Sequence, residues 1–233
     1  MPPVSGDGPH VFVADVAAPD LDPDDRHHLE RVLRLRPGDP FTVADGRGRW
    51  RPCTFGPVVA AAGDVASDPE PAPRLTVAFA LVKGERPELV VQKLTELGID
   101  RIVAFTAARS VVRWDDQKAA KQVERLRRVA REAAMQSRRT RLPQVDDLAS
   151  FADVLALPGA VAADRGGGAL TLDTPTVLIG PEGGWDPDER GRFGTTVGLG
   201  DQVLRAETAA LAAGTILGAL RSGLVAPAGT EAI

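Results

Sequence analysis

Two short apolar runs near the C-terminal end of the chain each lead into a glycine-containing turn and then into a helical pattern. The first segment is Val177–Trp185, which contains Gly-Pro-Glu-Gly-Gly, and the second is Val197–Leu211. A strand, a glycine turn and a helix in this order present backbone N–H and C=O groups to ligands in α/β proteins. The two turns could line one pocket, whose chemistry would lie in main-chain geometry more than in titratable side chains.

The chain from residue 74 onward alternates between strand and helix patterns. Apolar runs predict strands, and residues at helical spacing predict helices. The strands are expected at residues 75–82, 101–106, 160–163, 177–179 and 197–199, and the helices at 87–97, 115–137, 151–157, 186–193 and 208–220. This order indicates an α/β fold with a mainly parallel sheet that helices cover on both faces.

The first seventy residues follow a different pattern. Residues 24–35 have helical spacing, 41–44 and 50–55 read as a hairpin, and 11–13 and 58–62 are strand-like. Ser67–Pro73 then carries three prolines, which exclude a helix or a central strand. We therefore expect two domains, a small β-rich module at residues 1–70 and an α/β domain at 74–233, joined by an extended linker.

Composition excludes several classes of site. The chain has one cysteine, Cys53, and three histidines within its first thirty residues, so no intrachain disulfide can form and a zinc site is disfavoured. Neither a dinucleotide-binding nor a P-loop glycine motif is present, and Gly166–Gly168 reads as a flexible loop. No stretch approaches the roughly 20 apolar residues of a membrane span, and the first ten residues lack a secretory pattern. We expect a cytoplasmic protein without a metal ion.

Basic residues gather in one stretch of a chain whose net charge is −4. Residues 118–141 carry nine lysines or arginines against two glutamates. A basic stripe on an acidic protein suggests contact with a polyanion. A solvated helix face is the more common meaning of such a stripe, so both interpretations stay open.

Local structure also explains residues at the two glycine turns. Asp186 can cap the helix that follows it, with Glu189 completing a capping box. Thr208 can cap the last helix, and Glu207 would then lie at the positive helix end without a catalytic role. The last helix is apolar until Arg221, which indicates burial in the core or against a second subunit.

Six segments, taken in order, resemble one known family. They are His28–Asp39, Lys83–Gly98, Arg109–Asp115, Arg131–Arg139, Leu178–Gly184 and Val203–Ala209. Together they resemble the RsmE-type ribosomal RNA methyltransferases of the SPOUT superfamily. The resemblance extends from about residue 10 to residue 221. The chain departs from that pattern at Ala206, where threonine is common.

The resemblance implies a fold, a cofactor and partners. It implies a deep trefoil knot in the C-terminal SPOUT domain, an exception to the rule against knots, and a PUA-like N-terminal β-barrel. It also implies S-adenosyl-L-methionine as the methyl donor and an obligate homodimer. The implied reaction methylates N3 of a uridine in the decoding region of 16S rRNA, uracil 1498 in the usual 16S numbering, in the small (30S) ribosomal subunit.

With this resemblance, residues can be assigned to roles. The glycine turns would bind the cofactor, and Glu207 would assist proton removal. Arg205, Arg113 and Arg109 would stabilise developing negative charge on the uracil carbonyls or clamp phosphate. Trp114 could stack on a flipped base, although a core or interface role is more common. The expected cofactor residues are Ile179, Gly180, Gly183, Leu199, Gly200, Leu204 and Ala206, and the expected RNA-binding residues are Arg31, Arg34, Arg36, Arg109, Arg131, Arg138, Arg139 and Arg141.

Three other functions compete with this interpretation. A SPOUT enzyme acting on tRNA would share the fold. A non-catalytic RNA-binding module would use the β-rich module and the basic stripe without binding the cofactor. An anion- or nucleotide-binding enzyme could use the Gly-Pro-Glu-Gly-Gly turn, but no lysine lies near it.

Overall fold

The computed structural model describes residues 8–226, which divide into two compact units. Within these residues, the first unit contains 8–70 together with 131–142, and the second contains 71–130 together with 143–226. The prediction of two consecutive domains placed 131–142 in the second domain. The structure instead packs this segment with the first unit, through contacts that join residues far apart in the sequence.

The first unit is built on a mixed sheet. Within residues 8–70, β1 (His10–Phe12) runs parallel to β2 (Pro40–Ala44), and β2 pairs antiparallel with β3 (Arg49–Thr54). The short strands β4 (Ala60–Ala61) and β5 (Ala66–Ser67) both pair with β3. The predicted hairpin is therefore confirmed. One hydrophobic cluster underlies these strands and includes Val11, Leu29, Phe41, Val43 and Cys53.

The helix expected at residues 24–35 is shorter and irregular. The α-helix α1 (Pro23–His27) begins after Asp22, whose carboxylate accepts from the backbone N–H of Asp24. It widens directly into a π-helical turn, η2 (His28–Val32). Arg34 then takes a left-handed backbone with φ of 59°, which ends the helical run. The prediction of one continuous helix was wrong here, because the apolar spacing cannot distinguish an α-turn from a π-turn.

Contacts from residues 131–142 complete the first unit. The buried His10 ring lies with Nδ1 2.7 Å from the Thr42 hydroxyl and Nε2 3.1 Å from the backbone oxygen of Arg139. The pKa of His10 is lowered to about 4, mainly by burial and in part by the charge of Arg138, while the hydrogen bond with the backbone of Arg139 opposes the shift. The ring is therefore neutral at pH 7, and one of its two nitrogens accepts a hydrogen bond.

The second unit is built on a parallel sheet. Within the described residues its strand order is β12-β10-β11-β6-β7-β8, with β9 also pairing with β7. Every recorded pair is parallel, as predicted. The strands are β6 (Thr76–Ala80), β7 (Arg101–Thr106), β8 (Gln144–Val145), β9 (Ala149–Ser150), β10 (Ala160–Gly168), β11 (Thr176–Ile179) and β12 (Thr196–Val197).

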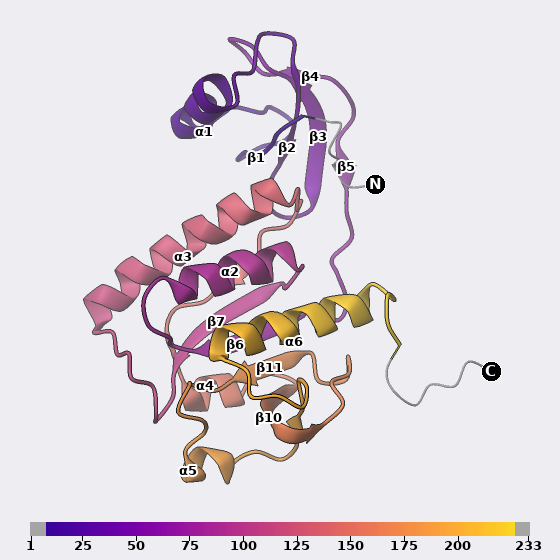
Figure 1. Cartoon of the computed structure of the whole chain (residues 1–233). Helices are drawn as coiled ribbons and strands as arrows, with labels where there is room; N and C mark the ends of the chain where they lie inside the picture. The colour runs from indigo at the N-terminus through magenta and orange to yellow at the C-terminus, as the bar shows by residue number, and fades with distance from the viewer. Residues whose placement is uncertain (1–7, 227–233) are drawn as a thin grey trace, which may run out of the picture. The chain divides into compact units, whose positions relative to one another are not determined.

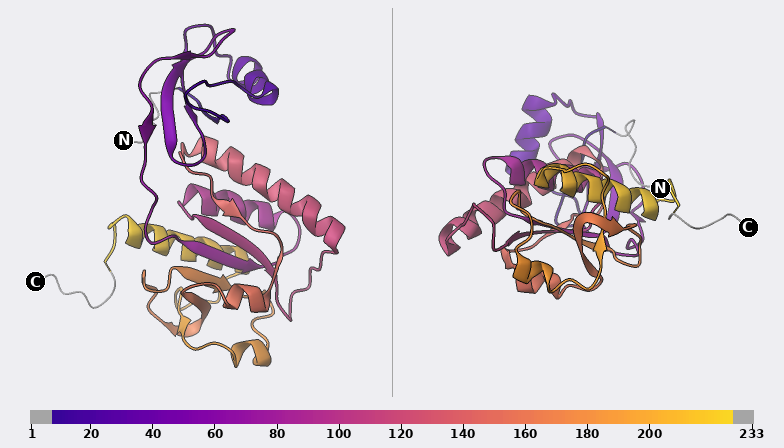
Figure 2. Two further views of the ribbon diagram at one scale, coloured as in Figure 1. Left: turned by 180° about the vertical axis from the view of Figure 1, so that it is seen from behind. Right: turned by 60° about the horizontal axis from the view of Figure 1, so that its bottom comes forward.

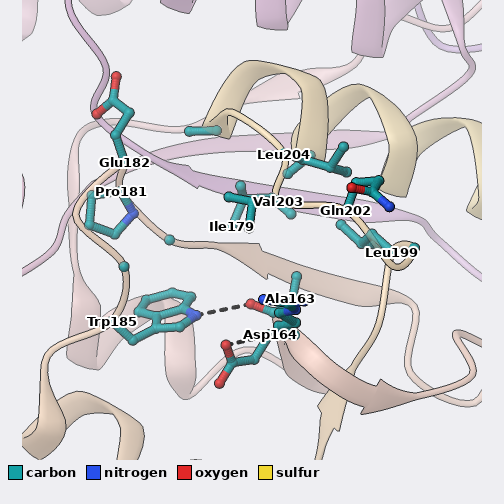
Figure 3. Close-up of a pocket in the computed structure, with 16 residues that line it drawn as sticks. Ala163, Asp164, Ile179, Pro181, Glu182, Trp185, Leu199, Gln202, Val203 and Leu204 are labelled. Carbon is teal, nitrogen blue, oxygen red and sulfur yellow. Dashed lines mark hydrogen bonds between the residues drawn. The ribbon is translucent and has the colours of Figure 1, made fainter.

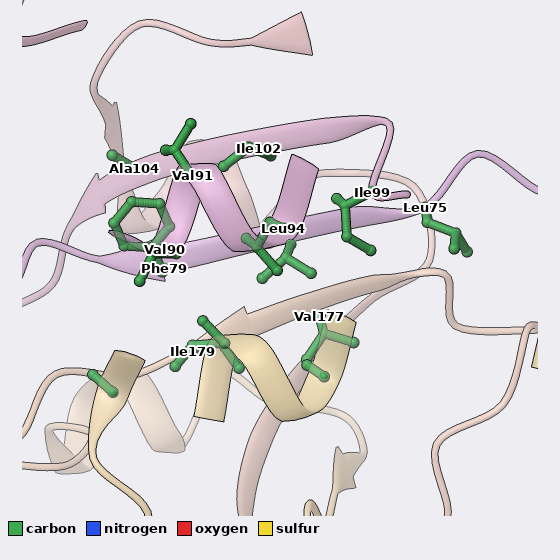
Figure 4. Packing of buried hydrophobic residues seen from close by; sticks show 14 of the residues in the cluster. Leu75, Phe79, Val90, Val91, Leu94, Ile99, Ile102, Ala104, Val177 and Ile179 are labelled. Atoms are coloured by element: carbon green, nitrogen blue, oxygen red, sulfur yellow. The ribbon is translucent and has the colours of Figure 1, made fainter. Parts of the chain in front are cut away.

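Side chains alternate between the two faces of this sheet. Val77 and Phe79 of β6 join one hydrophobic cluster, whereas Ala78 and Ala80 join another on the opposite face. The first cluster packs against α2 (Arg86–Glu96) and α6 (Ala206–Arg221), as Figures 1 and 4 show. The helix α3 (Asp116–Gln136) adds residues to the same cluster. On the other face lie α4 (Phe151–Leu155) and α5 (Pro187–Arg190), also visible from behind in Figure 2.

Two local predictions were wrong. The three glycines at 166–168 are not a flexible loop, because β10 continues through them after a register shift that follows Ala163. A side chain at Gly167 would place its Cβ 2.4 Å from the backbone of Val197, so only glycine allows β10 and β12 to approach this closely. The last helix begins at Ala206 with Arg205 as its N-cap, and not with Thr208.

Candidate functional site

A cavity of about 210 Å³ opens beside the carboxyl ends of three adjacent strands, β10, β11 and β12. Its lining comes from three segments: the bulge of β10, the end of β11 with the turn that follows, and the loop after β12 with the start of α6. The lining residues are Ala163–Arg165, Ile179–Glu182, Gly184, Trp185, Leu199, Gly200, Gln202–Leu204, Ala206 and Ala209. Figure 3 shows these three segments converging from separate parts of the chain. Ligands of parallel α/β sheets bind at this edge, because the loops that leave neighbouring strands meet there.

The turn after β11 is held by a buried tryptophan. Trp185 donates its indole N–H to the backbone oxygen of Ala163 at 3.0 Å (Figure 3) and stacks on Phe105. A Cβ at Gly180 would lie 2.9 Å from the Trp185 ring. Glycine is therefore required where β11 ends, and the ring and the strand end together form one wall of the cavity.

The helix that follows this turn is anchored by the predicted capping box. The Asp186 side chain accepts from Asp188, and the Glu189 carboxylate accepts from the backbone N–H of Asp186. Glu189 also accepts from the backbone N–H of Ala108 at 2.7 Å. This buried carboxylate therefore ties the segment after β7 to the start of α5. The structural interpretation of Asp186 is confirmed.

Arg109 approaches the same turn from the segment after β7. Its guanidinium donates to the backbone oxygen of Gly183 at 3.3 Å and lies 3.4 Å from the Asp186 carboxylate. The nearest atoms to a Cβ at Gly183 would be those of Arg109. Gly183 therefore faces Arg109 and is not among the residues that line the cavity.

The turn after β12 contributes an apolar rim. Leu199, Val203 and Leu204 line the cavity (Figure 3), and Val203 is 83% exposed. Gly200 has φ of 134°, a backbone conformation that side chains disfavour, and open space lies where its Cβ would be. This segment therefore offers backbone and apolar surface to a ligand, as its sequence indicated.

Six of the seven residues expected to bind a cofactor line this one cavity. They are Ile179, Gly180, Leu199, Gly200, Leu204 and Ala206, and the seventh is Gly183. Sequence reasoning missed the third wall, Ala163–Arg165, because no motif marks it and the adjacent glycines were interpreted as a loop. The polar side chains at the cavity are Asp164, Arg165, Glu182 and Gln202.

The three candidate catalytic residues lie outside this lining. Glu207 follows the lining residue Ala206 in the first turn of α6, and its side chain is 15% exposed. Its Oε1 atom lies 3.6 Å from Nε of Arg86, and its buried Oε2 atom has no hydrogen-bond partner among the described residues. Arg205 is exposed at the N-cap of α6, and the exposed Arg113 donates weakly to the backbone oxygen of Ala108 at 3.5 Å.

The arginines expected to bind RNA fall into two groups. Arg31, Arg34 and Arg36 are exposed in the first unit. By contrast, Arg131 makes a paired contact with the buried Asp25 at 2.6 and 3.1 Å, and Arg141 donates to the backbone oxygens of Asp68 and Pro69. The hydrogen bonds with Asp25 raise the pKa of Arg131.

These internal contacts give two of the arginines a structural role. Arg131 and Arg141 bind other parts of the first unit, and their contact with RNA stays a prediction. Arg138 and Arg139 are half-buried in the same segment, where Arg138 takes a left-handed backbone with φ of 56°. Trp114 is half-buried and packs against the main cluster of the second unit, the core role that was weighed against base stacking.

Comparison with known proteins gives one consistent family. The family model described as an RNA methyltransferase domain matches residues 68–218, and that described as an RNA methyltransferase PUA domain matches 21–56. Ribosomal RNA small subunit methyltransferase E from Mycobacterium bovis is 36% identical, over 87% of this chain and 86% of its own length. The chain belongs to the RsmE-type RNA methyltransferases.

Solved structures agree with this membership. The RsmE enzyme from Neisseria gonorrhoeae, bound to S-adenosyl methionine, is 26% identical, with a TM-score of 0.74 over 91% of this chain and 97% of its own. A methyltransferase from Legionella pneumophila with bound cofactor SAM is 27% identical, with a TM-score of 0.79 over 90% and 96%. The expected α/β fold with an N-terminal PUA domain is confirmed, whereas the knot stays a prediction.

Residues 8–226 contain no cluster of three or more His, Cys, Asp or Glu side chains arranged to hold a metal ion. Among the same residues, no helix has the length and apolar character needed to span a bilayer.

Proposed function

We propose that this RsmE-type protein uses S-adenosyl-L-methionine to methylate N3 of one uridine of 16S rRNA, the uracil at position 1498 in the usual numbering. One observation carries the proposal: the glycine turns after β11 and β12, which are separate in sequence, line a single cavity. Membership in an RNA methyltransferase family supports the reaction class. The names of the curated relatives support ribosomal RNA of the small subunit as the substrate.

The lining of the cavity fits this methyl donor. Ile179, Leu199 and Leu204 offer apolar walls to an adenine ring, and open space lies beside the main chain at Gly200. Asp164 and Gln202 offer polar partners for hydroxyl and amino groups. The cavity is smaller than the roughly 300 Å³ at which enclosed ligand sites begin, so it suits a ligand with one part buried and its reactive part open to a second substrate.

The reaction needs positioning and removal of one proton. When bound, the donor would supply an electrophilic methyl group on a sulfonium. As the N3–C bond forms, the S–CH3 bond would break and leave a neutral thioether, and the N3 proton must pass to a base. The N3 edge is engaged in base pairing in a duplex, so the target base must be unpaired or flipped out. The glycine turns would then contribute by holding the donor in line with the acceptor nitrogen.

Glu207 is the proposed acceptor of the N3 proton. Its Oε2 atom has no hydrogen-bond partner in the described part of the chain, so a lone pair is available there. Arg86 holds the other oxygen, which fixes the carboxylate beside the cavity. The positive end of α6 opposes this role, because it favours the charged carboxylate and so weakens it as a base. The role of Glu207 is therefore tested directly by substitution, as the Discussion describes.

Two arginines are proposed to act on charge that develops on the uracil carbonyls. Arg205 lies at the start of α6, immediately before Ala206, and its exposed guanidinium can reach outward from the cavity rim. Arg113 is exposed in the segment after β7. A guanidinium donates paired hydrogen bonds to carbonyl or phosphate oxygens, which suits either stabilisation of an oxyanion or a phosphate clamp.

The exposed arginines of the first unit are proposed to contact the RNA backbone. Arg31, Arg34 and Arg36 follow or belong to the π-helical turn η2 and face solvent. Arg109 is also exposed, near the cavity. We also propose a homodimer, because α6 keeps half-buried apolar residues such as Leu211 and Ile216. A knotted second domain and a cytoplasmic location are proposed from the family resemblance alone.

The decisive experiment is mass spectrometry of 16S rRNA from a strain that lacks this protein. The proposal expects the loss of one methyl group from one uridine, and its return when the wild-type gene is restored. An unchanged 16S rRNA together with a lost methyl group in tRNA would favour the tRNA enzyme. Calorimetry separates the non-catalytic module, which would release no heat with S-adenosylmethionine.

A further inference from the structure

Arg86 contacts one carboxylate in the turn after β11 and one in the first turn of α6, directly after the loop that follows β12. It lies in the first turn of α2, and its Nη1 atom donates to Oε1 of Glu182 at 3.1 Å. Its Nε atom lies 3.6 Å from Oε1 of Glu207. Glu182 lines the cavity after β11, and Glu207 follows the lining residue Ala206 after β12. Arg86 itself is not among the lining residues.

The geometry gives this arginine a task that a surface ion pair lacks. An exposed pair contributes little to stability, because solvent screens it and two long side chains must be ordered. Arg86 instead lies within ion-pair distance of two carboxylates from segments far apart in the chain, the turn after β11 and the start of α6, and its planar guanidinium can orient both. Both loops contain glycine at positive φ, Gly184 at 71° and Gly200 at 134°. Loops of this kind are costly to order when a ligand binds, and a preformed link reduces that cost.

We infer that Arg86 is a positioning residue, which holds the loops after β11 and β12 at the separation that binds the methyl donor. The inference deepens the proposed function and rests on it. Because Arg86 lies in α2, this helix would support the cofactor site through Arg86, although Arg86 does not line the cavity.

The test compares two substitutions on the same helix. Arg86→Met removes the charge and keeps an unbranched side chain. Lys93→Met removes an ion pair with Glu96 whose lysine has the same side-chain exposure of 38%. Isothermal titration with S-adenosylmethionine should show affinity about tenfold weaker for Arg86→Met and unchanged for Lys93→Met, with similar thermal midpoints. Arg86→Lys keeps a positive charge but loses the planar guanidinium with its several N–H donors. It should bind S-adenosylmethionine more tightly than Arg86→Met and less tightly than the wild type.

A double-mutant cycle shows whether Arg86 acts through the loop. Glu182→Ala should weaken binding of S-adenosylmethionine in the wild-type background, and should add little in the Arg86→Met background. Equal binding by wild type and Arg86→Met, or additive losses in the cycle, would overturn the inference. If Arg86→Met does not fold, Glu182→Ala and Arg86→Lys decide alone, and normal binding by both overturns it. Failure of the wild type to bind S-adenosylmethionine would overturn the proposed function as well.

Discussion

The cavity edge of the second unit and the basic segment at residues 131–141 make a useful contrast. At the cavity edge, six of the seven residues expected to bind the cofactor line one cavity. In the basic segment, the arginines expected to bind RNA differ in their surroundings, because Arg131 and Arg141 donate to acceptors inside the first unit. Both patterns were prominent in the sequence, yet only the first lies together in space as expected.

The difference lies in what each pattern specifies. A glycine turn after a parallel strand has a fixed place, since the carboxyl ends of parallel strands share one edge of the sheet. A charged side chain has no fixed place, because its partner can be solvent, a ligand or a distant acid. For Arg131 that acid is Asp25, 106 positions away in the chain. The sequence of a basic stripe therefore shows how many charges it carries, but not which side chains remain free to contact a binding partner.

The largest effect is expected from replacing Glu207, which tests whether catalysis at the cavity depends on main-chain geometry alone. Glu207→Gln should lower turnover about 100-fold or more, because it removes a proton acceptor. Binding of S-adenosylmethionine should change little, since glutamine keeps an oxygen that Arg86 can reach. Methyl transfer to small subunits from the deletion strain and calorimetry measure the two quantities. Glu96→Gln is the control, and unchanged turnover of Glu207→Gln would remove Glu207 from the mechanism.

The next effect concerns the wall made by Trp185. Gly180→Ala should weaken binding of S-adenosylmethionine by about 10- to 100-fold, because the new methyl group would lie 2.9 Å from the indole ring and displace it. Gly194→Ala is the matched control, as no atom lies within 4 Å of the added group there. Calorimetry of both variants decides the matter, and normal binding by Gly180→Ala would mean that this edge is not the cofactor site.

A smaller effect tests the structural role of the basic segment. Arg131→Met should destabilise the first unit by about 2 kcal/mol, because it leaves the buried Asp25 carboxylate without its paired donor. Arg128→Met, at an exposed position on the same helix, should have little effect. Hydrogen exchange of peptides from β1 to β3 reports the opening of this unit. Equal protection in the two variants would contradict the structural role of Arg131.

The smallest effect concerns the arginines that remain exposed. Replacement of Arg31, Arg34 and Arg36 by glutamine should reduce the slope of log affinity against log salt by about 2 to 3 units for 16S rRNA, as each phosphate contact contributes about 0.7 to 0.9. Replacement of Arg127, which pairs with Glu124 and Asp147, should leave the slope unchanged. If the salt dependence of RNA binding fell on replacement of Arg127 and not on replacement of the three exposed arginines, the paired arginine would be the one that contacts RNA. That result would contradict the distinction drawn between paired and exposed arginines.

Much of the fold followed from local patterns, and its exceptions have identifiable causes. The hairpin of β2 and β3, the strand β7 and the helix α2 were predicted within one or two residues, because apolar periodicity and turn residues are local signals. The strands β8 and β9 have two residues each and leave no periodic signal. The glycines at 166–168 were misinterpreted, because glycine marks both a loop and a close approach of two backbones.

The sequence by itself determined the family, the parallel sheet and two walls of the cavity, since each rests on a run of neighbouring residues. Only the tertiary structure decided the third wall at Ala163–Arg165, the pairing of Arg131 with Asp25 and the link from Arg86 to both loops. The physical reason is distance along the chain. Arg86 and Glu182 are 96 positions apart, and no local pattern records which strand order will bring such side chains into contact.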